Sequence, residues 1–330
     1  MKILFITSTR IGDAVLSTGA LNYLIQKHKG CEVSVVCGPL PATLFEGFPN
    51  IDEIIALKKE KHHKHWFKLW KKVSKTKWDI VVDFRNSLVS RTIFAKKRYI
   101  YGKQIDQKKH KVEQASHLIE RKLDIPAPKL YFTAEQEQFA DELLGSHGKF
   151  IAVGPTANWI GKTWESEKFI ETIEWLTRDE GPFPDMPVAI FAAPGEEEQA
   201  HKVFDALPED KRIDVIAKGN PGQVAAILNC AEFYLGNDSG LMHIAAACQV
   251  PTVGVFGPSY PHLYAPWGIH TAYAQTPETF DELTDFEGYD PKTLDRTLMK
   301  SLKTETLFNI IYDFLTEYES HRSSQSSKTA

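Results

Sequence analysis

The sequence predicts an α/β protein built from two doubly wound domains. Short runs of consecutive apolar residues, typical of strands buried on both faces, alternate with longer stretches that have the apolar spacing of helices. This alternation restarts near residue 150, so one parallel sheet is expected in each half of the chain. At 330 residues the chain is long enough to form two such domains.

The first half contains five candidate strands separated by helical stretches, the first helix being expected over about 14–28. The strands are expected at 2–7, 32–37, 53–57, 79–84 and 98–102. A parallel sheet covered by helices on both faces follows from this order.

The second half repeats the pattern. Strands are expected at 149–156, 187–193, 213–217, 233–238 and 252–258, with helices near 166–178, 196–206, 221–229 and 239–247. We place the boundary near 145, which gives domains of 1–145 and 146–330. A helix at about 304–318 closes the second domain, and the polar tail 319–330 is expected to be disordered.

Composition is that of a soluble globular protein, with 42% hydrophobic and 25% charged residues. No apolar run approaches the ~18–20 residues that span a bilayer, and the first ten residues are too short for the apolar core of a secretory signal. The four cysteines have no CxxC spacing, so we expect free thiols in a reducing cytoplasm.

Charge is distributed unevenly, although the whole chain carries only −4. Residues 1–130 contain 25 Lys and Arg against 12 Asp and Glu, whereas residues 131–330 contain 14 against 31. The two halves therefore face different electrostatic partners, or each other.

The stretch "GNDSGLMH" joins a strand to a helix at residues 236–243. Asp238 or Ser239 there can simply cap the free N–H groups of the helix. The same N–H groups also form an anion site, and Gly240 lets a phosphate approach the backbone. His243 lies four residues after Ser239 on the same helix face, where it is either structural or a ligand contact.

The stretch "TSTRIGDAVLS" places Asp13 at the start of the first expected helix. A carboxylate at this position is first of all an N-cap. Its functional reading is a base that accepts the proton of a substrate hydroxyl. The dinucleotide fingerprint GxGxxG is absent, and Asp13 would repel a pyrophosphate placed on this helix.

Two further strand-to-helix junctions carry charged side chains. Lys162 in "GPTANWIGKTW" is either a solvated lysine or a cation that neutralises a departing diphosphate. The three glutamates of "PGEEEQA", 196–198, either complement a helix dipole or supply an acceptor for ribose hydroxyls.

Residues 58–78 hold nine Lys and three His against one Glu, with Trp66, Leu69, Trp70 and Val73 at helical spacing. Such a helix either packs its aromatic stripe on its own domain or docks on an anionic membrane. The candidates for the membrane-facing or acceptor-facing side are Lys64, Trp66, Lys68, Trp70 and Lys71. No recognised nucleic-acid module accompanies the basic stretch, so no nucleic-acid partner is expected.

Four stretches in order resemble the ADP-heptose:lipopolysaccharide heptosyltransferases of glycosyltransferase family 9. They are "RIGDAVLS", "KTW", "PGEEEQA" and "NDSGLMHIAAACQVPTVGVFGPS", and the resemblance covers most of residues 1–260. It implies a GT-B fold, in which two Rossmann-like domains face each other across a cleft, with the acceptor in the first domain and the nucleotide sugar in the second.

The resemblance also implies roles for single residues. Asp13 matches the proposed catalytic base, Lys162 the lysine on the donor phosphates, and Glu196 most nearly the acid that binds the ribose. Asp238 and His243 match residues on the donor sugar and phosphates, Ser239 and Gly240 supply helix-start N–H groups, and Gly219 falls where the backbone holds the adenine. Ala157 and Asn158 stand where the family often has hydroxyl residues, which leaves Asn158 as a possible phosphate contact.

The activity implied is an inverting, metal-independent transfer of a heptose or related sugar from an ADP-sugar, with no other cofactor, to the lipopolysaccharide inner core. The absence of a D-x-D pair agrees with metal independence. The acceptor implied is an anionic lipid A bearing Kdo, met by the basic first half at the inner leaflet of the inner membrane, from a peripheral cytoplasmic location. Two alternatives are an inactive sugar-nucleotide-binding protein and a nucleotide-sugar epimerase of the same fold.

Overall fold

The computed structural model describes the backbone of residues 1–329 and the side chains of residues 1–322. It divides into two compact units. The first comprises residues 1–142 together with 219–226, and the second comprises residues 143–218 and the chain from Ile227 onward. Each unit is built on its own parallel sheet.

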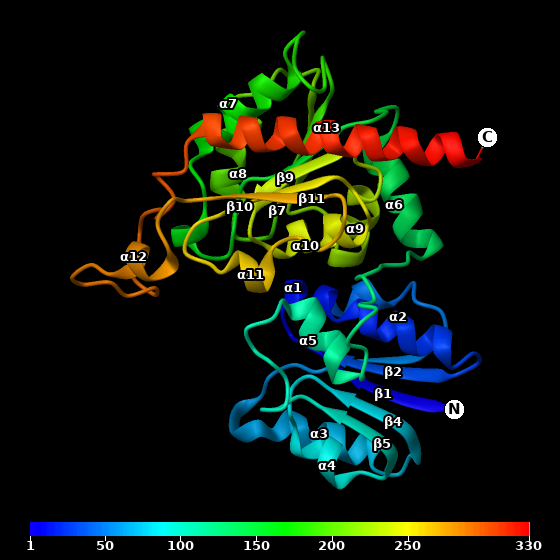
Figure 1. Cartoon of the computed structure of the whole chain (residues 1–330). Helices are drawn as coiled ribbons and strands as arrows, with labels where there is room; N and C mark the ends of the chain where they lie inside the picture. Colours follow the sequence, from blue (N-terminus) through cyan, green and yellow to red (C-terminus); the bar gives the residue numbers. More distant parts are fainter. Residues whose placement is uncertain (330) are drawn as a thin grey trace. The chain divides into compact units, whose positions relative to one another are not determined.

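The first unit contains a five-stranded sheet in the order β3-β2-β1-β4-β5, all strands parallel. Its elements are β1 (Lys2–Ile6), α1 (Ile11–Leu16), α2 (Thr18–Lys27), β2 (Glu32–Cys37), η1 (Leu40–Phe45), β3 (Ile51–Ala56), η2 (Lys61–His63), α3 (Lys64–Val73), β4 (Trp78–Asp83), α4 (Leu88–Thr92), β5 (Ala95–Ile100), α5 (Lys111–Leu118) and α6 (Ala134–Leu144). Helices α1, α2 and α5 lie on one face of this sheet, and α3 and α4 cover the other (Figure 1).

The second unit contains a six-stranded parallel sheet in the order β11-β10-β9-β6-β7-β8. Its elements are β6 (Ile151–Gly154), η3 (Ile160–Lys162), α7 (Ser166–Thr177), β7 (Val188–Ala192), α8 (Glu197–Phe204), β8 (Arg212–Ile216), α9 (Pro221–Leu228), β9 (Phe233–Asn237), α10 (Gly240–Ala247), β10 (Thr252–Phe256), α11 (Pro261–Tyr264), β11 (Thr271–Gln275), α12 (Phe280–Thr284) and α13 (Thr304–Thr329). The first residues of α9 are grouped with the first unit.

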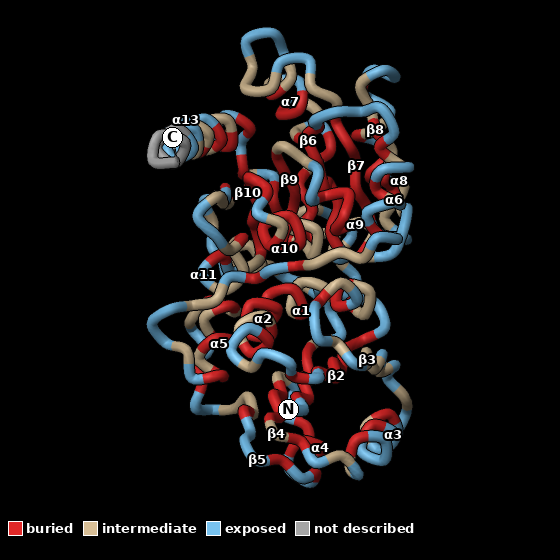
Figure 2. Tube along the Cα trace, turned by 90° about the vertical axis from the view of Figure 1, so that its right-hand side faces the viewer, coloured by how far each residue is buried: buried red, intermediate tan, exposed pale blue. Residues whose placement is uncertain are grey.

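The cores of both units are the strands and the helix faces that cover them. Figure 2 shows the buried residues concentrated along the strands, which accounts for their continuous apolar sequences. The expected α/β class with two doubly wound sheets is therefore confirmed. Among the residues described, no helix combines the length and the hydropathy needed to cross a membrane.

The first expected helix is interrupted. The stretch expected as one helix over 14–28 forms α1 and α2, which meet at Ser17. The side chain of Ser17 bonds to the carbonyl of Ala14 and lies 2.8 Å from the hydroxyl of Thr7, which ties the break to the end of β1. Because α1 starts at Ile11, Asp13 lies within its first turn, and the N-cap is Arg10 rather than Asp13.

The end of the chain also differs from the expectation. The last helix does not stop near residue 318, since α13 continues to Thr329, so the segment 319–329 is helical and not disordered. Tertiary contacts hold this extension: the ring of Tyr318 packs edge-on to His270 at 4.8 Å, and Arg322 pairs with Glu232 at 3.9 Å. Ala330 lies outside the described residues.

Candidate active site

The candidate donor site lies between β6 and β9, where the order in which the chain adds strands to the second sheet reverses. Strands β7 and β8 extend the sheet on one side of β6, and β9 to β11 extend it on the other. The loops after β6 and β9 therefore diverge at their carboxyl ends and leave room for a ligand, as in other doubly wound sheets. Lys162 follows β6 and Asp238 follows β9, so the fold brings both to this point.

Asp238 lies between two basic side chains. Its Oδ2 is 3.5 Å from Nζ of Lys162, and its Oδ1 is 3.9 Å from Nε2 of His243. Its own N–H donates to the carbonyl of Val255 on β10, which fixes the residue at the strand end. Since the Lys162 side chain is only 20% exposed and that of Asp238 10%, water screens this pair weakly.

Helix α10 begins directly after this carboxylate. Of the two expected candidates, Ser239 is the N-cap residue, in an extended backbone conformation, and Gly240 is the first residue of the helix. The structure reports no side-chain capping bond for Ser239. The first N–H groups of α10 therefore lie beside the Lys162–Asp238 pair, where the positive end of a helix and a lysine can together bind an anion.

The loop that carries Lys162 is held from below by buried hydrogen bonds. The N–H of Trp164 donates to Oδ1 of Asn237 at 2.9 Å, and the indole N–H donates to the carbonyl of Leu302 at 3.2 Å. Trp164 is fully buried. The carbonyl of Gly161 accepts the N–H of Leu298 at 3.0 Å, so the loop is anchored on both sides of the lysine.

Glu196 is the one of the three consecutive glutamates that faces this site. Its Oε2 accepts the hydroxyl of Thr156, which follows β6, at 2.5 Å. Glu197 instead accepts the N–H of Gly195, a bond that lowers the pKa of the Glu197 carboxyl, and Glu198 pairs loosely with Lys202. A carboxylate that accepts a hydroxyl here has the chemistry needed to accept ribose hydroxyls.

A buried tyrosine lies among these groups. Burial raises the pKa of Tyr234 strongly, the Ser239 hydroxyl partly offsets this, and the charges of Asp238 and Glu196 raise it further. Both carboxylates therefore act on one phenol. The hydroxyl occupies the space left by two glycines, since a Cβ at Gly154 or Gly236 would lie less than 3 Å from it.

The remaining two predicted residues lie in the loop before Lys162 and in the first compact unit. Asn158 is exposed in the loop between β6 and η3. Gly219 belongs to the first compact unit and has φ of +75°, where L side chains are strained. A Cβ on Gly219 would also lie 2.9 Å from the ring of Phe139, so a larger residue is excluded there.

In the first unit, Asp13 lies at the corresponding position, where the connections that follow the neighbouring strands β1 and β4 lead to opposite sides of the sheet. It is half-buried, and its Oδ2 is the acceptor for the hydroxyl of Ser8 at a long 3.4 Å. Arg85, which follows β4, reaches Thr9 after β1 at 3.4 Å. A carboxylate, hydroxyl groups and a guanidinium thus share this strand-end position.

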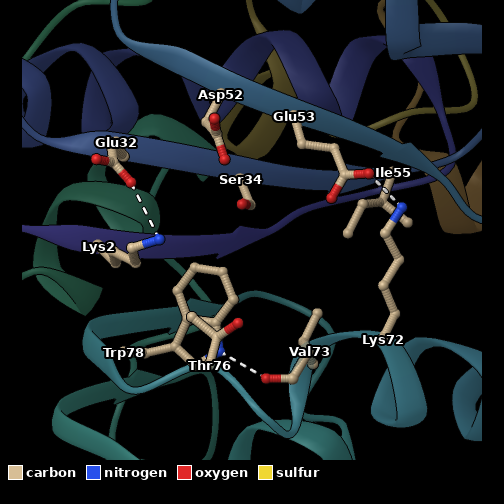
Figure 3. A pocket seen from close by; sticks show the side chains of 10 residues that line it. All are labelled: Lys2, Glu32, Ser34, Asp52, Glu53, Ile55, Lys72, Val73, Thr76 and Trp78. Atoms are coloured by element: carbon tan, nitrogen blue, oxygen red, sulfur yellow. Dashed lines mark hydrogen bonds and ion pairs between the residues drawn. The ribbon is translucent and has the colours of Figure 1, made fainter.

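A charged pocket of about 100 Å³ lies at the opposite ends of the strands of the first sheet (Figure 3). It is lined by the amino ends of β1 to β4 and by the end of α3, and its charges are paired as Lys2 with Glu32 at 3.1 Å and Lys72 with Glu53. Because ligands of doubly wound sheets bind at the carboxyl ends of the strands, this pocket is not the candidate site.

The model of glycosyltransferase family 9 (heptosyltransferase) matches residues 66–279, which is more than half of the chain. The chain belongs to glycosyltransferase family 9. Lys162, Glu196, Asp238 and His243 lie within the matched residues, whereas Asp13 precedes them.

Relatives of this family 9 glycosyltransferase include two groups of heptosyltransferases. Lipooligosaccharide heptosyltransferase 2 of Campylobacter jejuni is 28% identical over 281 residues, covering 81% of this chain and 85% of the relative. Lipopolysaccharide heptosyltransferase 1 of Escherichia coli K12 is 22% identical over 307 residues, covering 84% and 94%.

Solved structures of the family have the same fold. A family 9 glycosyltransferase of Veillonella parvula matches with a TM-score of 0.77 at 21% identity, covering 96% of this chain and 97% of that one. The ADP-heptose lipopolysaccharide heptosyltransferase II of E. coli matches with a TM-score of 0.73 at 19% identity, covering 97% and 100%. The expected GT-B fold is therefore confirmed.

Sequence reasoning missed three residues of the candidate donor site in this glycosyltransferase. Thr156 supplies a hydroxyl just before Ala157, where none was assigned, and its position directly after β6 was a usable signal. Asn237 and Tyr234 lie within a strand that was expected only to be buried. Their contacts depend on which strands are neighbours, which the sequence does not state.

Proposed function

We propose that this glycosyltransferase moves a heptose from ADP-heptose to a sugar hydroxyl of the lipopolysaccharide inner core, with inversion at the anomeric carbon. The observation that carries the proposal is the convergence of Lys162, Asp238, Glu196 and the start of α10 at one strand-end position. Its relatives are lipopolysaccharide and lipooligosaccharide heptosyltransferases. A structure of the E. coli heptosyltransferase WaaC with ADP shares its fold at 20% identity.

In this proposal the second unit holds the diphosphate and the ribose of the donor. Lys162 and the N–H groups of Ser239 and Gly240 contact the diphosphate, because a lysine and a helix start both favour negative charge. Glu196 accepts the ribose hydroxyls, in place of or together with the Thr156 hydroxyl it accepts here.

The remaining donor contacts involve the sugar and the base. Asp238 and His243 contact the heptose and its phosphates, and the backbone at Gly219 contacts the adenine. Asn158, exposed in the loop before Lys162, is a further candidate for a phosphate contact.

The chemical step is a displacement at the anomeric carbon. Asp13 accepts the proton of the acceptor hydroxyl. At the same time the oxygen of that hydroxyl bonds to the anomeric carbon from the face opposite the diphosphate. The bond from this carbon to the phosphate oxygen breaks, and its electron pair leaves with ADP. Lys162 and the start of α10 stabilise the charge that develops there, so we propose that no metal ion is required.

The proposed acceptor is an anionic lipid A bearing Kdo. The basic first unit suits such an acceptor, since residues 1–130 carry 25 Lys and Arg against 12 Asp and Glu. An acceptor anchored by acyl chains places the enzyme at a membrane surface, so we propose a peripheral location on the cytoplasmic face of the inner membrane. No nucleic-acid partner is proposed.

Donor binding and transfer are tested separately. Thermal shifts with ADP, UDP, GDP and CMP should show the largest stabilisation with ADP. The protein is incubated with ADP-heptose and a Kdo-bearing lipid A acceptor in the presence of EDTA. Mass spectrometry should show that one heptose is added to the acceptor, and NMR should show that the anomeric configuration is inverted. Binding of ADP without transfer would indicate an inactive nucleotide-sugar-binding protein, and a change in the donor sugar without an acceptor would indicate an epimerase.

A further inference from the structure

We propose that an exposed apolar patch on α3, on α4 and directly after α4 inserts into the surface of an anionic lipid bilayer. The patch, called the α3–α4 patch below, consists of Phe67, Trp70, Leu88 and Phe94, whose exposures are 67%, 39%, 77% and 53%. The inference deepens the proposed function, on which it rests, because the acceptor proposed there is a lipid held in a membrane.

The orientation of α3 is fixed by its contacts with the sheet. Leu69 and Val73 are buried in the core below it, and Trp66 packs against the same core. Trp66, expected to face a membrane or acceptor, is therefore a packing residue. Lys72 pairs with Glu53 on the edge strand β3, which places that flank of the helix toward β3 (Figure 3).

The opposite flank of α3 carries the aromatic side chains. At 100° per residue, Phe67 and Trp70 point away from Lys72, on the side of α4. Their rings stack with a centroid distance of 6.2 Å and an interplanar angle of 18°. Two neighbouring aromatic side chains thus pack on each other while both stay open to solvent.

Helix α4 extends this surface. Val89 of α4 and Ile93, which caps it, share the buried core with Leu69 and Val73 of α3, so the two helices lie side by side, as both views show (Figures 1 and 2). Leu88, the first residue of α4, and Phe94, between α4 and β5, are both exposed. The unit therefore presents four large apolar side chains from α3, from α4 and from the segment directly after α4.

Positive charge surrounds the patch. Residues 58–77 contain nine lysines and one glutamate, Glu60, which pairs with Lys68 at 2.7 Å. On the outer face of α3, Lys64 and Lys71 have no ion pair among the side chains that the structure describes. Apolar side chains bordered by uncompensated lysines match a bilayer with anionic headgroups, where indole and phenyl rings enter the interface and lysines stay among the phosphates.

Vesicle binding provides the test. The full chain should co-sediment with vesicles of phosphatidylglycerol and phosphatidylethanolamine at low salt, and weakly with phosphatidylcholine alone. The double variant Phe67→Ser/Trp70→Ser should bind the anionic vesicles at least 10-fold more weakly, and Lys64→Gln/Lys71→Gln about 25-fold, at about fivefold per lysine. The matched control is Tyr312→Ser on α13, which replaces an aromatic residue with 65% exposure outside the patch. This variant should bind the anionic vesicles like the unchanged chain.

Insertion itself is read from tryptophan fluorescence. Trp70 is the most exposed of the seven tryptophans, so brominated phosphatidylglycerol should quench the wild-type signal and leave Trp70→Phe nearly unquenched while that variant still binds. Unchanged binding of the aromatic double variant, or equal quenching of Trp70→Phe, would overturn the proposal. So would binding that depends on the lysines alone, or a patch that binds a protein partner and not vesicles.

The proposed function has its own readout. Transfer to a deacylated, water-soluble acceptor needs no membrane, so the single variant Phe67→Ser should keep the wild-type rate in that assay. Vesicle binding without any transfer would refute the proposed function and support insertion of the patch into the bilayer. Transfer without vesicle binding would support the proposed function and refute insertion of the patch.

Discussion

Replacing Lys162 with methionine tests the donor site most directly. The change removes an ammonium that lies 3.5 Å from Asp238 and is 20% exposed. That separation is long for a charged hydrogen bond, so Lys162 can bind a diphosphate instead of Asp238 with little loss of free energy. A charge-assisted contact to phosphate contributes about 1.5–3 kcal/mol, which corresponds to about a 10- to 150-fold rise in the dissociation constant for ADP. The Asp238 carboxylate, left without its cation, should repel the phosphates and move the result toward the upper figure.

Isothermal titration calorimetry with ADP measures this effect. Lys202→Met is the matched control, because it removes the same charge from the same unit. The Lys202 side chain is 60% exposed and pairs loosely with Glu198, at 4.0 Å. The control should bind ADP like the unchanged chain. If Lys162→Met keeps its melting temperature and binds ADP within twofold of the unchanged chain, Lys162 does not contact the donor phosphates.

Three other changes test the remaining parts of the argument. Asp13→Asn should lower kcat at least 100-fold and leave ADP affinity within threefold, and an unchanged kcat would remove Asp13 from the mechanism. Asn237→Leu leaves the N–H of Trp164 buried without its acceptor, so urea unfolding should show a loss of about 1–3 kcal/mol; a change below 0.5 kcal/mol would contradict this. Burial raises the pKa of Cys37 to about 12, so the folded chain keeps a proton that the unfolded chain loses above about pH 8.5. The free energy of unfolding should therefore fall from pH 8.5 upward, by at most about 1.4 kcal/mol per pH unit from this thiol, and less steeply in Cys37→Ala; identical slopes would exclude the thiol as a cause.

Much of the fold was predictable because buried parallel strands have a simple sequence signature. Strands such as β6 and β7 are continuous apolar runs, and each appears at the expected place. The break between α1 and α2 was not predictable, since it depends on a bond between Ser17 and Thr7 that forms only after β1 is in place. The length of α13 likewise depends on Tyr318 and His270, which are distant in sequence.

The residues of the candidate donor site were predictable where a charged residue follows a strand. Asp238 and Lys162 were found in this way, and the structure brings them together. The choice of Glu196 among three glutamates needed the resemblance, and the structure adds the physical reason in its bond to Thr156. On α3, sequence spacing could not separate Trp66, which packs inward, from Phe67, which does not.

The anchoring of Trp164 has a consequence for the far end of the chain. The carbonyl of Leu302 accepts both the indole of Trp164 and the amine of Lys168, and Leu298 bonds to Gly161 one residue before Lys162. Backbone groups of residues 298 and 302 thus hold the loop that carries Lys162. Under the proposed function, sequence changes between residues 298 and 302 should therefore alter nucleotide affinity while every side chain proposed to contact the ligand stays the same.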